Sequence, residues 1–193
     1  MASFTFRCTA FVGITVDGFI ARQDGSIDYL PPAPASSPHE HPVCAVPTIS
    51  DMLANSDMLI LGRHTYETVL GFGEENWPYG DKPLLVMSTQ PDDQLRLPAG
   101  AARVQNLDEA VRIVHDRGYR NVWVDGGRTI CGFLERQLVT EMILTTVPIA
   151  LGRGIPLFQG IKKDLKLEVV ASEVICDLLT TKYRVVYDAA EAQ

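Results

Sequence analysis

Two segments of the chain pass from a short apolar run through glycine directly into a helix-like segment. The first is LILGRHTYE at residues 59–67, and the second is VWVDGGRTI at residues 122–130. A short, continuous apolar run is typical of a strand that is covered on both faces, as in a parallel sheet. Both junctions would open at the carboxyl edge of such a sheet, which is where ligands bind in these folds.

Apolar periodicity along the rest of the chain predicts alternating strands and helices. Strands are predicted at residues 6–16, 58–61, 84–87, 121–124 and 141–147, with a further short one at Val104. Helices are predicted at residues 48–55, 64–70, 107–117 and 126–138. Residues 165–173 and 178–187 indicate an antiparallel hairpin. We therefore predict one α/β domain over residues 1–193, with a mostly parallel sheet, helices on both faces and a C-terminal hairpin.

A polar, proline-rich stretch at residues 21–47 interrupts this alternation. A loop longer than about 12–15 residues in a compact domain is usually functional or disordered. His39, His41 and Cys44 lie in this stretch and could be read as a metal cluster. Their spacing fits no zinc pattern, so we predict no metal site.

The composition argues against several classes of partner. The formal net charge of −7 disfavours nucleic acid, because proteins that bind its phosphate backbone usually present a basic face. No apolar run approaches about 18–20 residues, and the N-terminus has no signal-peptide pattern, so we expect no membrane span. The four cysteines, Cys8, Cys44, Cys131 and Cys176, have no CxxC spacing, as expected of free thiols in a reducing compartment. Together these absences favour a cytoplasmic location.

The two glycine junctions are the best candidates for a binding site. Backbone N–H groups at a helix N-terminus favour an anion, and Arg63 and Thr65 could add a guanidinium fork and a hydroxyl. The pair Gly126-Gly127 would let a dinucleotide pyrophosphate approach the backbone closely. The alternative is that each junction is only a tight turn, since the GxGxxG fingerprint is absent.

The junctions and their flanking segments resemble known reductases. LGRHTYE, KPLLVMST and VDGGRTICGFLE, in this order and spacing, resemble dihydrofolate reductases. TVDGFIARQDGSIDYL and PIALGRGIPLF are more similar to the reductase half of the bifunctional riboflavin-biosynthesis deaminase-reductase and to its stand-alone relatives. The resemblance covers roughly residues 6–187 and implies a dihydrofolate-reductase-like fold.

This resemblance also implies NADPH as the cofactor and assigns residues to its parts. Arg63 would face the adenosine 2′-phosphate, with Ser88 nearby. The residues that would meet the pyrophosphate and its flanking ribose are Gly62, His64, Thr65, Gly126, Gly127, Arg128 and Thr129. The residues that would lie near the nicotinamide are Val12, Gly13, Ile20 and Ile130.

The chain differs from the folate reductases at the acidic residue that binds their pterin, on the helix before the GRHT strand. The corresponding position in this chain lies near Val46 and Pro47, which are not acidic, and Asp51 is a turn further on. Asp125 replaces the first glycine of the usual triple. The zinc deaminase pattern HxE…PCxxC is also missing, so we expect no deaminase half in this sequence.

Asp28 is our candidate for the catalytic acid. It falls in the loop that covers the active site in the resembled fold, where partial burial could keep its carboxyl group protonated near neutral pH. The alternative is a solvated loop aspartate. Asp17, in the VDG turn, is expected to shape that turn through hydrogen bonds to the backbone.

Three functions stay open at this point. The first is an NADPH-dependent reductase that transfers hydride to a small heterocyclic or ribosylamino-type substrate. The second is a true dihydrofolate reductase with a displaced acid. The third is a nucleotide-binding or flavin-binding module without turnover. Relatives of this kind are often dimers, so a homodimer is one of the states that the sequence leaves open.

Overall fold

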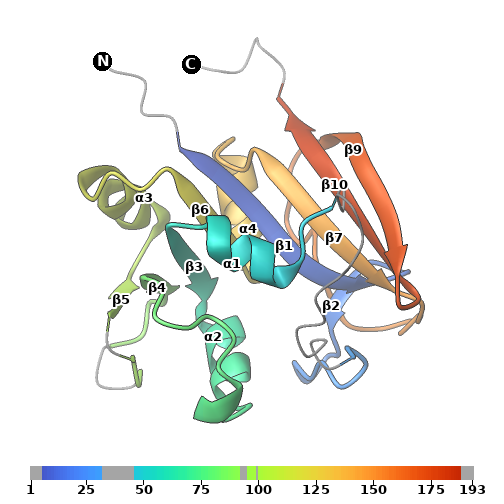
Figure 1. Cartoon of the computed structure of the whole chain (residues 1–193), viewed down its shortest axis with the longest axis horizontal. Coiled ribbons are helices and arrows are strands. Elements are labelled where there is room, and N and C mark those ends of the chain that lie inside the picture. The colour runs from blue at the N-terminus through green and yellow to red at the C-terminus, as the bar shows by residue number, and fades with distance from the viewer. Residues whose placement is uncertain (1–5, 32–45, 92–94, 99, 188–193) are drawn as a thin grey trace.

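A single large sheet organises the computed structural model, which describes residues 6–31, 46–91, 95–98 and 100–187. Its eight strands lie in the order β5-β4-β3-β6-β1-β7-β10-β9 (Figure 1). They are β1 (Arg7–Thr15), β3 (Met58–Gly62), β4 (Leu84–Met87), β5 (Ala101–Val104), β6 (Asn121–Asp125), β7 (Glu141–Val147), β9 (Lys166–Ile175) and β10 (Leu178–Val186).

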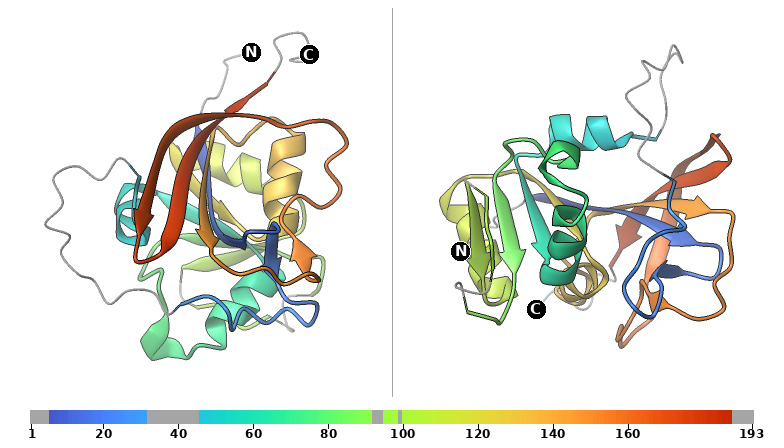
Figure 2. Two further views of the ribbon diagram at one scale, coloured as in Figure 1. Left: turned by 90° about the vertical axis from the view of Figure 1, so that its right-hand side faces the viewer. Right: turned by 90° about the horizontal axis from the view of Figure 1, so that it is seen from below.

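The direction of the strands confirms a mostly parallel sheet with a C-terminal antiparallel hairpin. Every pair from β5 across to β7 is parallel. Strand β10 runs antiparallel to both β7 and β9. Figure 2 (left) shows this hairpin in front of the rest of the sheet.

Four α-helices complete three layers, as the sequence predicts. Helices α3 (Leu107–Asp116) and α4 (Gly127–Glu135) pack their apolar side chains into the core on one face of the sheet. Helices α1 (Ile49–Asn55) and α2 (Arg63–Leu70) pack into a second core on the opposite face (Figure 2). Strands β3, β4 and β6 contribute to both cores, which explains their continuous apolar runs.

Some details differ from the prediction. Strands β2 (Phe19–Ala21) and β8 (Ile155–Pro156) form a separate two-stranded antiparallel sheet that was not predicted. Short runs of this kind give too few residues for a periodic signal. Helix α4 ends at Glu135 rather than at residue 138, because Gln137 adopts a left-handed backbone with φ of 56°. A 3₁₀ turn, η1 (Glu74–Asn76), also follows α2.

Two further predictions, of no metal site and no membrane span, can be compared with the structure only over the described residues. His39, His41 and Cys44 lie outside them. Within the described ranges no three His, Cys, Asp or Glu side chains gather as a metal-binding group would. Over those same ranges, no helix combines the length and apolar character needed to cross a membrane.

Candidate functional site

The connections after β3 and β6 leave the sheet on opposite faces. These two strands are parallel neighbours, and Leu61 lies beside Asp125 at their carboxyl ends. Strand β3 leads into α2 on one face, whereas β6 leads into α4 on the other. Such a switch in direction opens a crevice at the carboxyl edge of a parallel sheet, which is the usual position of a ligand. Both glycine junctions of the sequence lie at this switch.

The two junctions contact each other through a reciprocal pair of glycines and threonines. A Cβ atom on Gly62 would lie 2.8 Å from Thr129 Oγ1, and one on Gly126 would lie 2.6 Å from Thr65 Oγ1. Gly126 also needs a φ of +95°, which side chains rarely allow. Each helix therefore places the threonine three residues after its glycine cap against the glycine of the other helix.

This contact predicts a specific pattern of stability. Gly62→Ala should lower the free energy of unfolding by about 1–3 kcal/mol, since the new methyl group overlaps Thr129 Oγ1. Adding Thr129→Ala should recover most of the loss, giving a coupling energy of about 0.5–3 kcal/mol in a double-mutant cycle. Chemical denaturation of the four proteins measures it.

Gly132→Ala is the matched control for this cycle. Its Cβ atom would meet only Leu107 Cδ1, at an ordinary 3.6 Å, so the change should stabilise α4 by up to about 1 kcal/mol. If Gly62→Ala were as well tolerated as Gly132→Ala, the two junctions would not be in the contact described.

The helices that start at the junctions lack side-chain caps. Gly62 and Gly126 are the N-caps of α2 and α4, and neither helix has an acidic residue in its first turn. In contrast, Thr48 caps α1 in a capping box and Asn106 caps α3. A side-chain cap stabilises a helix by about 1 kcal/mol. The two helices that start at the crevice have no such cap. Their first backbone N–H groups and the positive ends of their dipoles are therefore available to bind an oxyanion.

Arg63 lies at the first turn of α2 beside this crevice. Its Nε donates to Glu67 Oε1 at 2.7 Å, and 23% of its side chain is exposed. Because this bond uses Nε, the terminal amino groups of the guanidinium can turn toward a ligand. Ser88 directly follows β4, whose last residue pairs with Gly62, so it lies at the same edge. The hydroxyl group of Ser88 is buried and accepts from Gln90 N.

The residues expected beside the nicotinamide separate into two groups. Val12 and Gly13 lie on β1, where a Cβ atom on Gly13 would meet Leu30 Cδ2 at 3.0 Å. Leu30 therefore covers Gly13 from the loop after β2. Ile20 lies against Gly127, whose added Cβ atom would be 2.7 Å from Ile20 Cδ1. Ile130, however, is fully buried in the core, so the structure gives it no surface for a ligand.

Asp28 does not have the environment that we expected for it. Its carboxylate pairs with Arg22 Nε at 2.5 Å, and 63% of its side chain is exposed. The hydrogen bond from Arg22 lowers the pKa of Asp28 below its ordinary value. The prediction that Asp28 is partly buried with a raised pKa was therefore wrong. The nearby guanidinium of Arg22 stabilises the ionised form of this carboxyl group.

Asp125 has the properties that were expected of Asp28. It is half-buried at the carboxyl end of β6, and burial raises its pKa to about 7 although Gly126 N donates to its Oδ1 at 2.6 Å. It lies on the same side of the sheet as Trp123, which precedes it by two residues. The signal available in the sequence was the replacement of the usual glycine by an acid.

Asp17 has the structural role that was expected of it, and Trp77 also has a structural role. Asp17 accepts hydrogen bonds from Thr15 Oγ1 within its turn and from the backbone of Leu151 and Gly152 across it. Trp77 donates to Gly80 O at 3.1 Å and packs edge-on against Tyr79, so it anchors its loop.

Comparison with known proteins identifies the family of the chain. A family model described as the RibD C-terminal domain matches residues 8–180. The Bacillus subtilis (strain 168) protein YwjB is 30% identical over 164 residues, covering 84% of this chain and 88% of its own.

Solved structures agree with the family match. A putative riboflavin biosynthesis protein from Shewanella sp. PV-4 is 32% identical, with a TM-score of 0.77, over 94% of this chain and all of that one. A diaminohydroxyphosphoribosylaminopyrimidine deaminase/5-amino-6-(5-phosphoribosylamino)uracil reductase from Thermotoga maritima is 15% identical, with a TM-score of 0.65. The present chain covers 57% of that protein and shares its fold.

Proposed function

Because this chain belongs to the family of RibD C-terminal domains, we propose that it is a reductase that uses NADPH to reduce a small heterocyclic or ribosylamino-type substrate. The observation that carries the proposal is the pair of uncapped helix N-termini at the switch point of the sheet. A dinucleotide pyrophosphate is the anion that suits this crevice, since it needs both close backbone approach and N–H donors.

The residues around the crevice fit the three parts of such a cofactor. The N-termini of α2 and α4 would hold the pyrophosphate, with Thr65 and the exposed Arg128 beside it. Arg63 and Ser88 would lie toward the 2′-phosphate, one strand further along the edge. When bound, the nicotinamide supplies the hydride, and the protein supplies its position, the exclusion of water and a proton.

Strand β1 and the carboxyl end of β6 would border the reacting atoms. Leu30 fills the space over Gly13 and would exclude water from this side. Val124 of β6 pairs with Ala10 of β1, and Asp125 is the next residue along β6. Neighbouring strands are about 5 Å apart, so the backbone of Asp125 lies at about this distance from β1. A carboxyl group with a pKa near 7 at this place would be protonated in a useful fraction of molecules and could donate a proton to the reduced product.

Arg63 should determine the preference for NADPH over NADH. Its charge-assisted hydrogen bonds to a 2′-phosphate should contribute about 1.5–3 kcal/mol, or roughly 10- to 100-fold in affinity. We expect Arg63→Gln to weaken NADPH by this factor and to leave NADH nearly unchanged. Titration calorimetry with both cofactors measures it, and NADH serves as the internal control. Equal affinity of the unaltered protein for the two cofactors would remove this role from Arg63.

One assay separates the three functions that the sequence left open. The absorbance of NADPH is followed with a ribosylaminopyrimidine, with dihydrofolate and without substrate. Oxidation with the pyrimidine supports the reductase proposed here, whereas a specificity constant for dihydrofolate of about 10⁴–10⁸ M⁻¹s⁻¹ would make the protein a folate reductase. Tight NADPH binding without turnover of either compound would favour a binding module.

A cytoplasmic location and a homodimer complete the proposal. The support for a dimer is the apolar surface of the hairpin, where Val169 and Val174 of β9 are 62% and 67% exposed. Light scattering across a range of protein concentrations tests this part separately from the activity.

A further inference from the structure

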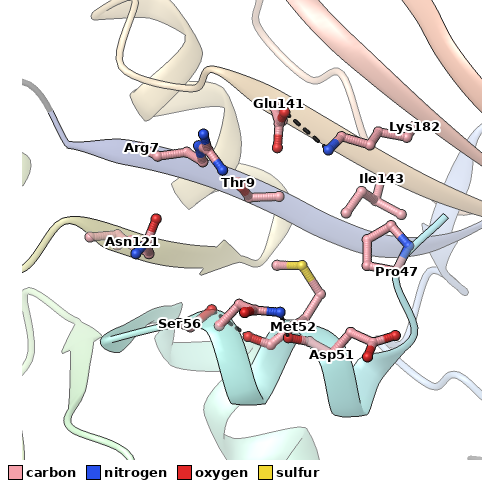
Figure 3. A pocket seen from close by; sticks show the side chains of 12 residues that line it. Arg7, Thr9, Pro47, Asp51, Met52, Ser56, Asn121, Glu141, Ile143 and Lys182 are labelled. Atoms are coloured by element: carbon pink, nitrogen blue, oxygen red, sulfur yellow. Dashed lines mark hydrogen bonds and ion pairs between the residues drawn. The ribbon is translucent and has the colours of Figure 1, made fainter. Parts of the chain in front are cut away.

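A cavity of about 430 Å³ lies between α1 and the amino ends of the central strands (Figure 3). Its sheet wall comes from β1, β6, β7 and β10, and its opposite wall comes from α1. The glycine crevice lies at the carboxyl ends of the same strands. Arg7 and Gly13 are six positions apart on β1, so the two places are separated by about 20 Å.

The sheet wall of this cavity is polar where a helix-covered sheet face is normally apolar. Strand register places Arg7 beside Asn121 and Thr9 beside Glu141. Lys182 follows on β10, beside Ile143. These polar residues cross four neighbouring strands on the face that α1 covers, whereas Trp123 and Ile143, which come next along β6 and β7, belong to the apolar core. Arg7 is exposed, Thr9 is buried, and the other three polar residues are partly buried. Polar groups on a covered face are costly unless they have partners or water.

Two cations, Arg7 and Lys182, and two carboxylates, Glu141 and Asp51, line the cavity. Lys182 Nζ and Glu141 Oε1 form an ion pair at 3.1 Å, with about a quarter of each side chain exposed. Asp51 accepts from Thr48 in the capping box of α1 and keeps its negative charge. The Arg7 guanidinium has no hydrogen bond or ion pair among the described residues. Arg7 can therefore pair with one added negative charge, whereas the two carboxylates would repel a second, which suits a monoanion better than a dianion.

The remaining wall is partly apolar. Met52 and Pro47 contribute from the side of α1 and Ile143 contributes from the sheet, whereas Asn55 and Ser56 add polar groups. Pockets that hold small molecules typically measure about 300–1,000 Å³ and combine apolar walls with a few polar groups that fix orientation. The cavity under α1 has a volume in this range, and its lining is more polar than that of a typical pocket.

We propose that this cavity is a second binding site, which takes a small monoanionic carboxylate with an apolar body. The planar fork of Arg7 binds the carboxylate in a bidentate manner, with Asn121 beside it on the neighbouring strand. Met52 and Ile143 contact the apolar body. The site lies outside the proposed cofactor crevice and does not depend on the proposed reductase function.

Three probes of similar shape test the charge requirement. They are benzoate as the monoanion, phenyl phosphate as the dianion and benzyl alcohol as the neutral analogue. Amide chemical shifts of the ¹⁵N-labelled protein are followed as each probe is added, without NADPH. We expect benzoate to saturate below about 10 mM, with shifts confined to residues 7–9, 51–56, 121–122 and 141–143. Phenyl phosphate and benzyl alcohol should each bind at least tenfold more weakly.

Arg7→Gln should weaken benzoate about tenfold or more, because a charge-assisted fork is lost. Arg120→Gln is the matched control, since Arg120 is an exposed arginine at the same end of the sheet outside the cavity lining. Absence of saturation, tighter binding of phenyl phosphate, or equal effects of the two substitutions would each overturn the proposal. NADPH affinity should not change in Arg7→Gln, which separates this test from that of the reductase function.

Discussion

Asp125→Asn is expected to slow reduction of the true substrate about 10²–10⁴-fold, the usual contribution of a general acid. The variant keeps an oxygen that accepts from Gly126 N, so the turn and the NADPH affinity should be preserved. In the unaltered protein the rate should fall as the pH rises through about 7, where Asp125 loses its proton. Asparagine does not titrate, so this limb of the profile should disappear. Single-turnover oxidation of NADPH between about pH 5 and pH 9 measures both effects.

Asp28→Asn is the matched control, because Asp28 was the acid predicted from the sequence. Its carboxylate is exposed and paired with Arg22, and its pKa is lowered, so it holds no proton near neutral pH. We expect this variant to change the rate far less than Asp125→Asn. If Asp28→Asn removed the pH limb and Asp125→Asn did not, the proton would come from the loop, and a closed form of that loop would have to break the Arg22 pair.

Most of the fold could be predicted because its helices show an apolar period and its central strands are continuous apolar runs. The eight strands of the main sheet and the four α-helices all lie where apolar patterns indicate them. The small sheet of β2 and β8 could not be predicted, since three residues and two residues have no period to detect. The end of α4 depends on the left-handed backbone of Gln137, a residue type without a strong preference for it.

The candidate site was only partly predictable, because sequence locates turns but not contacts across the sheet. The two glycine junctions could be identified from strand and glycine patterns alone. Their reciprocal contact through Thr65 and Thr129 depends on β3 and β6 being neighbours in the sheet, although the paired residues Met58 and Val122 are 64 positions apart in the sequence. The contrast between Asp28 and Asp125 has the same origin, since pairing with Arg22 lowers the pKa of Asp28 and burial raises that of Asp125.

Asp125 should also give the stability of the protein a distinct dependence on pH. Its pKa is about 7 in the folded protein and 3.8 in an unfolded chain, so the folded state binds more protons between these values. Stability from the protonated carboxyl group is fully present below pH 3.8 and is lost as the pH rises through about 7. Because one pKa unit corresponds to about 1.4 kcal/mol, the loss should approach about 4 kcal/mol.

Asp125→Asn should remove this loss. The variant should match the unaltered protein near pH 4 and exceed it in free energy of unfolding by up to about 4 kcal/mol above pH 8. Urea denaturation of the protein without ligand, at several pH values, measures the difference. Asp28→Asn should show the opposite sign, since pairing with Arg22 lowers the pKa of Asp28 and its stabilisation is lost as the pH falls. Parallel pH profiles for Asp125→Asn and the unaltered protein would mean that the carboxyl group of Asp125 is solvated, and its role as the proton source would then lose its physical basis.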